Sequence, residues 1–256
     1  MLSLPNVTLI CVDCLNGERA IVALERSKLG IEFGAVKLLT SEKIAAQFPG
    51  YPHTVVIPAI NSINDYSAFC LKRLHEFVDT SHLLLVQHDG CVLNASAWDG
   101  AWHNYDYIGP LFEQDRELSA RSVGSGGFSF RSRRLCAAVS SMCPAWDGKN
   151  SYDGHDGKNN WGHEDGAICY HCRGRLEAQG MIFATPEHAA VFAHGRSPFL
   201  RCHTSFGFHG YCPEIEARGV DSSKVQLSAA RIKQLYTEGY TGPLTRDMVE
   251  KALQMW

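Results

Sequence analysis

The feature that most constrains the fold is an alternation, in the first third of the chain, of short apolar runs with amphipathic helical patterns. Buried strands are predicted by four runs rich in Val, Ile and Leu, at 7–12, 33–39, 54–57 and 82–87. Helical spacing of apolar residues predicts helices at 17–29 and 64–78, the second capped by Asn64-Asp65. Strands that alternate with helices favour a mostly parallel sheet covered on both faces. The sequence therefore predicts an α/β fold, in which ligands collect at the carboxyl ends of the strands.

Composition excludes several classes of protein. The chain has 256 residues with a formal net charge of −3, and 45% of its residues are hydrophobic, which excludes a disordered or collagen-like chain. No strongly basic stretch is present, so we expect no nucleic-acid partner. Apolar runs such as Leu83–Val86 are too short to span a bilayer, and Met1–Pro5 lacks the basic region of a signal peptide. We therefore expect a cytoplasmic protein without a transmembrane segment, and leave peripheral association with a membrane open.

No composition shift marks a linker between domains. We expect one domain over residues 1–220 and a short helical tail over 221–256 that packs on it. The ten cysteines are scattered, which favours small buried thiols in a reducing compartment over a disulfide framework. The alternative is a zinc site built from Cys169-x-x-Cys172 with Cys202 and Cys212, although the second pair is more widely spaced than zinc ligands usually are.

Polar residues follow two of the predicted strands. Asp13 comes after the first strand, and Gln87-His88-Asp89 comes after the fourth. A carboxylate at a strand end can hold a hard divalent cation, and such an ion can neutralise a departing diphosphate. The alternative interpretation is an aspartate that caps the next turn.

Two adjacent carboxylates, Glu164 and Asp165, follow a segment at 147–162 that is rich in Gly, Asn and Asp. Adjacent like charges raise one another's pKa, which suits one of them to work as a general base. They also fit the start of a helix, where acids face the helix dipole favourably, and both interpretations can hold together. We expect the segment before them either to order over a ligand or to be a mobile surface excursion.

Two glycine-containing segments complete the candidate set. His209, within Phe206–Gly210, is either a metal ligand or a hydrogen-bonded packing residue. Gly124–Gly127 allows backbone N–H groups to approach a ligand closely. It is neither a Walker loop, because no Lys-Ser or Lys-Thr follows, nor a dinucleotide fingerprint, because it does not follow the first strand.

The order of these segments resembles that of glycosyltransferases of the GT-A fold, and in particular a bacterial family of glycosyltransferase-like proteins catalogued as a domain of unknown function. The matching residues extend over about 7–210 and comprise Val7–Ile10 with Asp13, Asp65–Ser67, Leu84–Gly90, Trp98, Tyr105–Gly109, Gly126–Ser129, Glu164-Asp165 and Phe206–Gly210. Trp161-Gly162-x-Glu164-Asp165 is also similar to the Trp-Gly-x-Glu-Asp motif of the β-1,4-galactosyltransferases. The resemblance implies a GT-A-like, Rossmann-like sheet. It also implies a metal-dependent, inverting transfer of a sugar from a nucleotide sugar to a hydroxyl of a glycan or other acceptor. The nucleotide sugar that we expect as donor is a UDP-sugar.

The same resemblance implies roles for individual residues. Asp165 would be the catalytic base and Glu164 would contact the acceptor, while Asp89 and His209 would hold Mn²⁺ or Mg²⁺. The nucleotide would be bound by Val12, Asp13, Tyr66, Gln87 and His88. The donor and acceptor sugars would be bound by Gly126, Gly127 and Trp161.

One residue departs from the family pattern. Gln87 stands where most such enzymes carry the first aspartate of Asp-x-Asp. A glutamine can still hydrogen-bond a ribose hydroxyl, but it lowers the negative charge of the site, so metal dependence stays open.

Two other functions are compatible with the sequence. A sugar nucleotidyltransferase usually carries a glycine-rich, basic loop after the first strand, and the segment 13–19 has only one Gly and one Arg. A catalytically inactive carbohydrate-binding protein could stack sugars on Trp98, Trp102 and Trp161, but the presence of both Glu164 and Asp165 argues against it.

Overall fold

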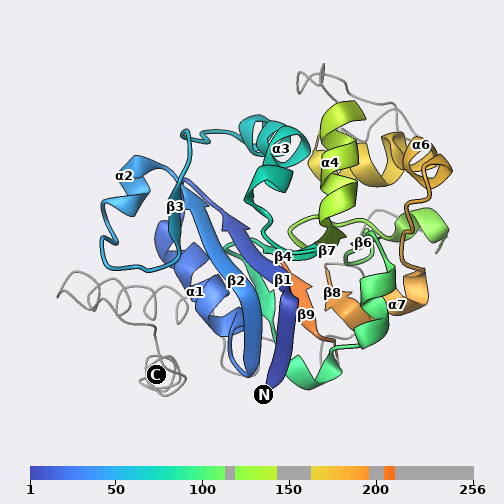
Figure 1. The fold of residues 1–256 in the computed structure, drawn as a ribbon, viewed down its shortest axis with the longest axis horizontal. Helices are drawn as coiled ribbons and strands as arrows, with labels where there is room; N and C mark the ends of the chain where they lie inside the picture. The colour runs from blue at the N-terminus through green and yellow to red at the C-terminus, as the bar shows by residue number, and fades with distance from the viewer. Residues whose placement is uncertain (113–118, 143–162, 196–204, 211–256) are drawn as a thin grey trace.

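A six-stranded sheet forms the centre of the molecule in the computed structural model, which describes residues 1–112, 119–142, 163–195 and 205–210 (Figure 1). The strand order is β3-β2-β1-β4-β7-β6. The strands are β1 (Leu2–Val12), β2 (Ile31–Thr40), β3 (Thr54–Val56), β4 (His82–Val86), β6 (Tyr107–Ile108) and β7 (Phe128–Ser132). The first four run parallel, whereas β7 is antiparallel to β4 and β6 is antiparallel to β7. The predicted mostly parallel sheet is therefore confirmed.

Helices cover both faces of this sheet (Figure 1). They are α1 (Gly17–Ser27), α2 (Glu42–Ala45), α3 (Ile63–Lys72), α4 (Arg133–Met142), α5 (Glu164–Gly166), α6 (Arg173–Ala178) and α7 (Pro186–Phe192), with a π-helical turn at Ala167–His171. Short 3₁₀ turns lie at Leu74–Phe77, Ala95–Ala97, Gly100–Asn104 and Ala120–Ser122. Alternate residues of the strands enter different cores: Leu9 packs in the cluster that contains α1, and Ile10 in the cluster that contains α3. This alternation is the period of two expected of strands buried on both faces.

The helix predicted at 64–78 is shorter than expected and begins earlier. Ser62 is its N-cap, and its hydroxyl accepts a hydrogen bond of 3.1 Å from the Asp65 backbone N–H, so the predicted cap at Asn64-Asp65 is wrong. The helix ends at Lys72, because the φ of −127° at the next residue, Arg73, is not helical, and the chain continues as the 3₁₀ turn. The turn still buries Leu74, so the apolar pattern continues although the α-helix does not.

A second, three-stranded sheet brings a distant segment to the end of β4. It contains β5 (Gly90–Val92), β8 (Ala193–His194) and β9 (Gly207–His209), with β9 in the middle. In the antiparallel β5–β9 pair, Gly90 lies opposite His209. A Cβ at Gly90 would lie 2.7 Å from the Phe208 carbonyl oxygen, so only glycine permits this approach.

The cysteines that the structure describes agree with the buried-thiol interpretation. All seven are buried, and none of them forms a disulfide with another described cysteine. Burial raises the pKa of the Cys11 and Cys169 thiols, which keeps them protonated. Cys202 and Cys212 of the zinc alternative lie outside the described residues, as do the segment 147–162 and the tail 221–256.

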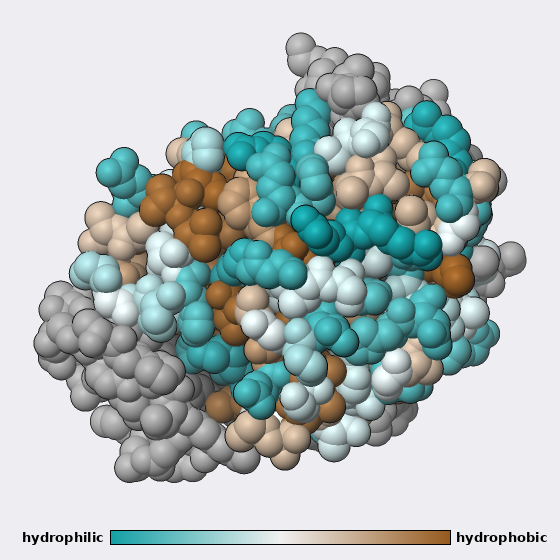
Figure 2. Space-filling model, in the orientation of Figure 1, coloured by the Kyte–Doolittle hydropathy of each residue, from teal (hydrophilic) through white to brown (hydrophobic). Residues whose placement is uncertain are grey.

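The surface is mainly hydrophilic on the face drawn in Figure 2. Exposed hydrophobic side chains include Val56 and Ile63, at the two ends of the connection from β3 to α3. Within the described residues, no helix combines the length and the apolar character needed to cross a membrane.

Candidate functional site

The polar residues that follow β1 and β4 meet at one edge of the sheet. Cys11 of β1 pairs in register with Val86 of β4, so the residues just beyond them are neighbours. His88 Nδ1 lies 2.9 Å from Asp13 Oδ2. The predicted nucleotide-binding residues Val12, Asp13, Gln87 and His88 therefore share the carboxyl edge.

Asp13 is engaged by the protein itself. Its Oδ1 accepts hydrogen bonds from the backbone N–H groups of Leu15 and Asn16, at 2.7 and 2.6 Å. Burial alone would raise the pKa of Asp13, but the hydrogen bonds from His88, Asn16 and Leu15 outweigh it and hold this pKa below its ordinary value. Asp13 thus stays ionised and stabilises the turn into α1, as a turn-capping aspartate does.

The two predicted metal ligands, Asp89 and His209, lie side by side although they are far apart in the sequence. His209 Nε2 is 3.5 Å from Asp89 Oδ1 and 3.0 Å from Gln87 Oε1. The other ring nitrogen, Nδ1, lies 3.2 Å from Ser125 Oγ. The pairing of β5 with β9 brings His209 next to Asp89. The Gly210 N–H also donates a 3.0 Å hydrogen bond to the Asp89 carbonyl.

The donors around His209 fit a divalent cation. Asp89 Oδ1 is buried and accepts no hydrogen bond from the described residues. A buried carboxylate oxygen without a donor would be stabilised by a bound cation. Gln87 Oε1 is an acceptor, so in this geometry Nε2 carries the ring proton and Nδ1 accepts a hydrogen bond from the Ser125 hydroxyl. Binding an ion would require the other tautomer, in which Nδ1 donates to Ser125 Oγ and the Nε2 lone pair is directed at the ion. The described residues contain no cluster of three or more His, Cys, Asp or Glu side chains that could hold a metal. An ion here would therefore need Gln87, water or a ligand's oxygens as well, as Mg²⁺ sites commonly do.

Gly126 and Gly127 pack between the acid pair and the histidine. A Cβ at Gly126 would lie 2.3 Å from Glu164 Oε1, and a Cβ at Gly127 would lie 2.0 Å from His209 Nε2. The sequence suggested that these glycines let the backbone approach a ligand. In the structure they let it approach the site's own side chains, so the two halves of the site come together.

Asp165 is a half-buried carboxylate in the first turn of α5. Its Oδ2 accepts a hydrogen bond from the Gly126 N–H at 2.9 Å, and its Oδ1 accepts one from the Gly166 N–H at 2.7 Å. Burial and the adjacent charge of Glu164 raise the pKa of Asp165 to about 6, against the opposing effect of these hydrogen bonds. The helix-start interpretation is confirmed, and the raised pKa also suits a general base.

Glu164 points away from solvent and pairs with a buried arginine. Its side chain is 4% exposed, and its Oε1 accepts a 2.9 Å hydrogen bond from Arg131 Nη2. The Arg131 guanidinium is fully buried, lies over the Tyr107 ring at 5.3 Å, and donates to the Gly126 carbonyl at 3.3 Å. The acceptor contact predicted for Glu164 would thus require a carboxylate that Arg131 already holds. The sequence analysis did not single out Arg131, because three of the five residues of Phe128–Ser132 are polar and only the structure shows that all five are buried.

Tyr66 and Trp161 complete the predicted set. Tyr66 lies in α3 with a buried hydroxyl; burial, then Cys70 and Glu164, raise the pKa of this phenol well above its ordinary value. It therefore stays protonated and available as a hydrogen-bond donor. Trp161 lies outside the described residues.

Comparison with known proteins places the chain in a family. The family described as "Protein of unknown function (DUF5672)" matches residues 53–209. The chain belongs to this family. The DUF5672 region begins before β3 and ends at His209. It therefore contains the candidate metal ligands Asp89 and His209, the glycines Gly126 and Gly127, and the acids Glu164 and Asp165.

No curated protein matches the chain. Among solved structures, it is similar to a glycosyltransferase involved in the glycosylation of the major capsid of PBCV-1, with 11% identity, a TM-score of 0.45, and coverage of 91% of this chain and 98% of that one. It is also similar to the galactosyltransferase LgtC in complex with donor and acceptor sugar analogs, with 12% identity, a TM-score of 0.47, and coverage of 96% and 99%.

Proposed function

We propose that this protein is a glycosyltransferase that moves a hexose-type sugar from a nucleotide sugar to an acceptor hydroxyl with inversion. One observation carries the proposal: the loop Ser125–Gly127 contacts both Asp165 and His209. Asp165, a carboxylate with a raised pKa, thus lies near the candidate metal ligands Asp89 and His209. All three lie at the carboxyl edge of an α/β sheet, where such folds bind ligands.

Asp165 is the proposed base. Its pKa of about 6 leaves it mostly ionised at neutral pH, and makes it more basic than an ordinary aspartate. The N–H groups of Gly126 and Gly166 orient the carboxylate, one on each oxygen. In this orientation it would accept the proton of the acceptor hydroxyl as that oxygen attacks the anomeric carbon, and correct placement would supply much of the rate.

Asp89 and His209 are the proposed holders of Mn²⁺ or Mg²⁺, with Gln87 beside them. A bound divalent cation would supply charge neutralisation for the diphosphate of the donor. Ser125 orients the His209 ring, and the neutral amide of Gln87 can bind either the ion or a ribose hydroxyl. A UDP-sugar is the proposed donor.

The test is incubation with a panel of nucleotide sugars in Mn²⁺, in Mg²⁺ and in EDTA. We expect metal-stimulated donor hydrolysis or transfer, with inverted anomeric configuration in the product as read by NMR. Asp165→Asn should lose turnover while keeping nucleotide binding. Asp79→Asn, which changes an exposed aspartate paired with Lys37 outside the site, is the matched control.

Other outcomes would replace the proposal. Pyrophosphate exchange without glycosyl transfer would identify a nucleotidyltransferase. Sugar binding without turnover of any donor would identify a carbohydrate-binding protein.

A further inference from the structure

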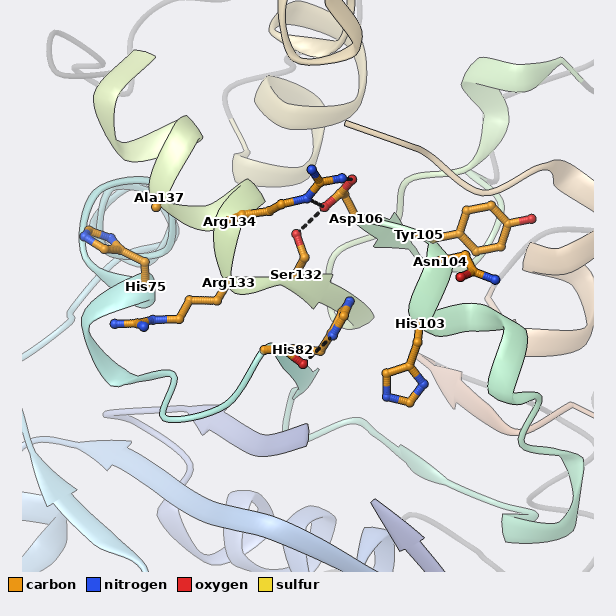
Figure 3. A pocket seen from close by; sticks show the side chains of 11 residues that line it. His75, His82, His103, Asn104, Tyr105, Asp106, Ser132, Arg133, Arg134 and Ala137 are labelled. Atoms are coloured by element: carbon orange, nitrogen blue, oxygen red, sulfur yellow. Dashed lines mark hydrogen bonds and ion pairs between the residues drawn. The ribbon is translucent and has the colours of Figure 1, made fainter. Parts of the chain in front are cut away.

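A cavity lies at the opposite end of β4 from the candidate site. β4 runs from His82 to Val86; the candidate site follows Val86, and this cavity surrounds His82 (Figure 3). Its volume is about 610 Å³, within the range of small-molecule sites. Five residues of a strand span roughly 15 Å, so the two sites are separate.

The charges that line this cavity leave one cation unneutralised. Asp106 is the one acid among the lining residues, and Arg134 binds both of its oxygens at 2.6 and 2.5 Å. Arg133 is exposed and has no carboxylate partner among the described residues. The acids nearest in sequence are engaged elsewhere, because Glu76 pairs with Arg73 and Asp79 pairs with Lys37. The cavity therefore favours an anion.

The groups that suit an anion gather at one end of the cavity. Figure 3 shows Arg133 extending to the same side as His75. His75 also lines the cavity, and its buried Nδ1 has no hydrogen-bond partner among the described residues. The ten-residue helix α4 also begins at Arg133, and its dipole adds positive potential there.

The other end of the cavity offers neutral hydrogen-bonding and ring surfaces. Figure 3 places His103, Asn104 and Tyr105 on the side away from Arg133, and the ring of His82 points toward them. His82 stacks on Phe130 with ring centroids 4.8 Å apart, and burial, followed by the proximity of His103, lowers the pKa of His82 to about 4. At neutral pH His82 is therefore an uncharged surface, and this end suits hydroxyl groups.

We propose that this cavity binds a small phosphomonoester that also carries hydroxyl groups, such as a phosphorylated polyol or sugar. The phosphate would lie against Arg133 and His75, because a guanidinium fork matches phosphate oxygens and the helix start favours a dianion. The hydroxyl groups would extend toward Asn104 and His103. This binding is independent of the proposed glycosyl transfer.

Isothermal titration calorimetry at pH 7 in EDTA tests the site, with glycerol 3-phosphate as the probe. We expect saturable binding of glycerol 3-phosphate and none of glycerol. Arg133→Gln should weaken binding at least tenfold. Arg121→Gln, which changes an exposed arginine that does not line the cavity, should leave it unchanged. Arg133 is exposed, so both variants should keep the wild-type melting temperature.

Two further variants separate the parts of the proposal. Asn104→Ala should weaken glycerol 3-phosphate more than inorganic phosphate, because it removes a group from the hydroxyl end only. Asp89→Ala, in the candidate metal site, should leave glycerol 3-phosphate affinity unchanged.

The proposal is overturned if glycerol 3-phosphate gives no saturable heat, if Arg133→Gln binds as well as wild type, or if Asp89→Ala abolishes binding. Vesicles of phosphatidylcholine and phosphatidic acid distinguish a lipid headgroup from a free ligand. If the protein sediments with these vesicles but does not bind glycerol 3-phosphate, the proposal of a free phosphomonoester ligand is also overturned.

Discussion

Replacing Gly127 by alanine tests whether the candidate site is assembled as described. A Cβ at this position would lie 2.0 Å from His209 Nε2 and 2.4 Å from two ring carbons. The φ of Gly127 is not positive, so the backbone accepts alanine and the histidine ring receives the whole clash.

The displacement follows from these distances. An ordinary contact begins at 3.4 Å, so the ring must retreat by about 1.4 Å from its 2.0 Å position. Metal ligands tolerate about 0.2 Å, so His209 would leave any coordination sphere shared with Asp89. The overpacking should cost about 1–3 kcal/mol of unfolding free energy. Mn²⁺ affinity should fall roughly tenfold or more, as it does when the groups supporting a ligand are lost.

Two measurements check this prediction: Mn²⁺ titration by calorimetry in the presence of UDP, and urea unfolding without metal. Gly100→Ala is the matched control, because nothing lies within 4 Å of the added Cβ. Unchanged Mn²⁺ affinity in a folded Gly127→Ala variant would refute the reasoning, since either the ring has not moved or it holds no metal.

Four other predictions concern the acids and the helix cap. Turnover should rise with pH with a midpoint of about 6, and Asp165→Asn should lower it roughly 100-fold. The Asp165 carboxyl keeps its proton up to about pH 6 in the native state but loses it near pH 3.8 in the unfolded chain. The free energy of unfolding of the wild type should therefore fall as pH rises from about 3.8 to 6, and the melting temperature of Asp165→Asn should lack this fall. Arg131→Met should cost roughly 3–5 kcal/mol in urea unfolding because it strands the Glu164 charge, and adding Glu164→Gln should recover part of it; a single-variant cost below about 1 kcal/mol would contradict the pair. Ser62→Ala should cost about 1 kcal/mol and Asn64→Ala much less, and equal losses would show that Ser62 is not the cap.

The sequence by itself determined the sheet and the edge at which polar residues collect. Apolar periodicity reports local burial, so Val7–Val12 and His82–Gln87 could be assigned as strands before any contact was known. Because those strands are parallel, their ends had to lie together, and His88 does meet Asp13.

Tertiary structure alone decided which distant groups touch. His209 reaches Asp89 only because β9 pairs with β5 in one register, and neither short strand has a pattern that specifies a partner. Glu164 is held by Arg131 because α5 packs where a strand residue points inward, which no local spacing encodes. The helix after Ser62 ends at Lys72 because packing of Leu74 can be satisfied by a 3₁₀ turn, and apolar spacing does not distinguish the two helices at that length.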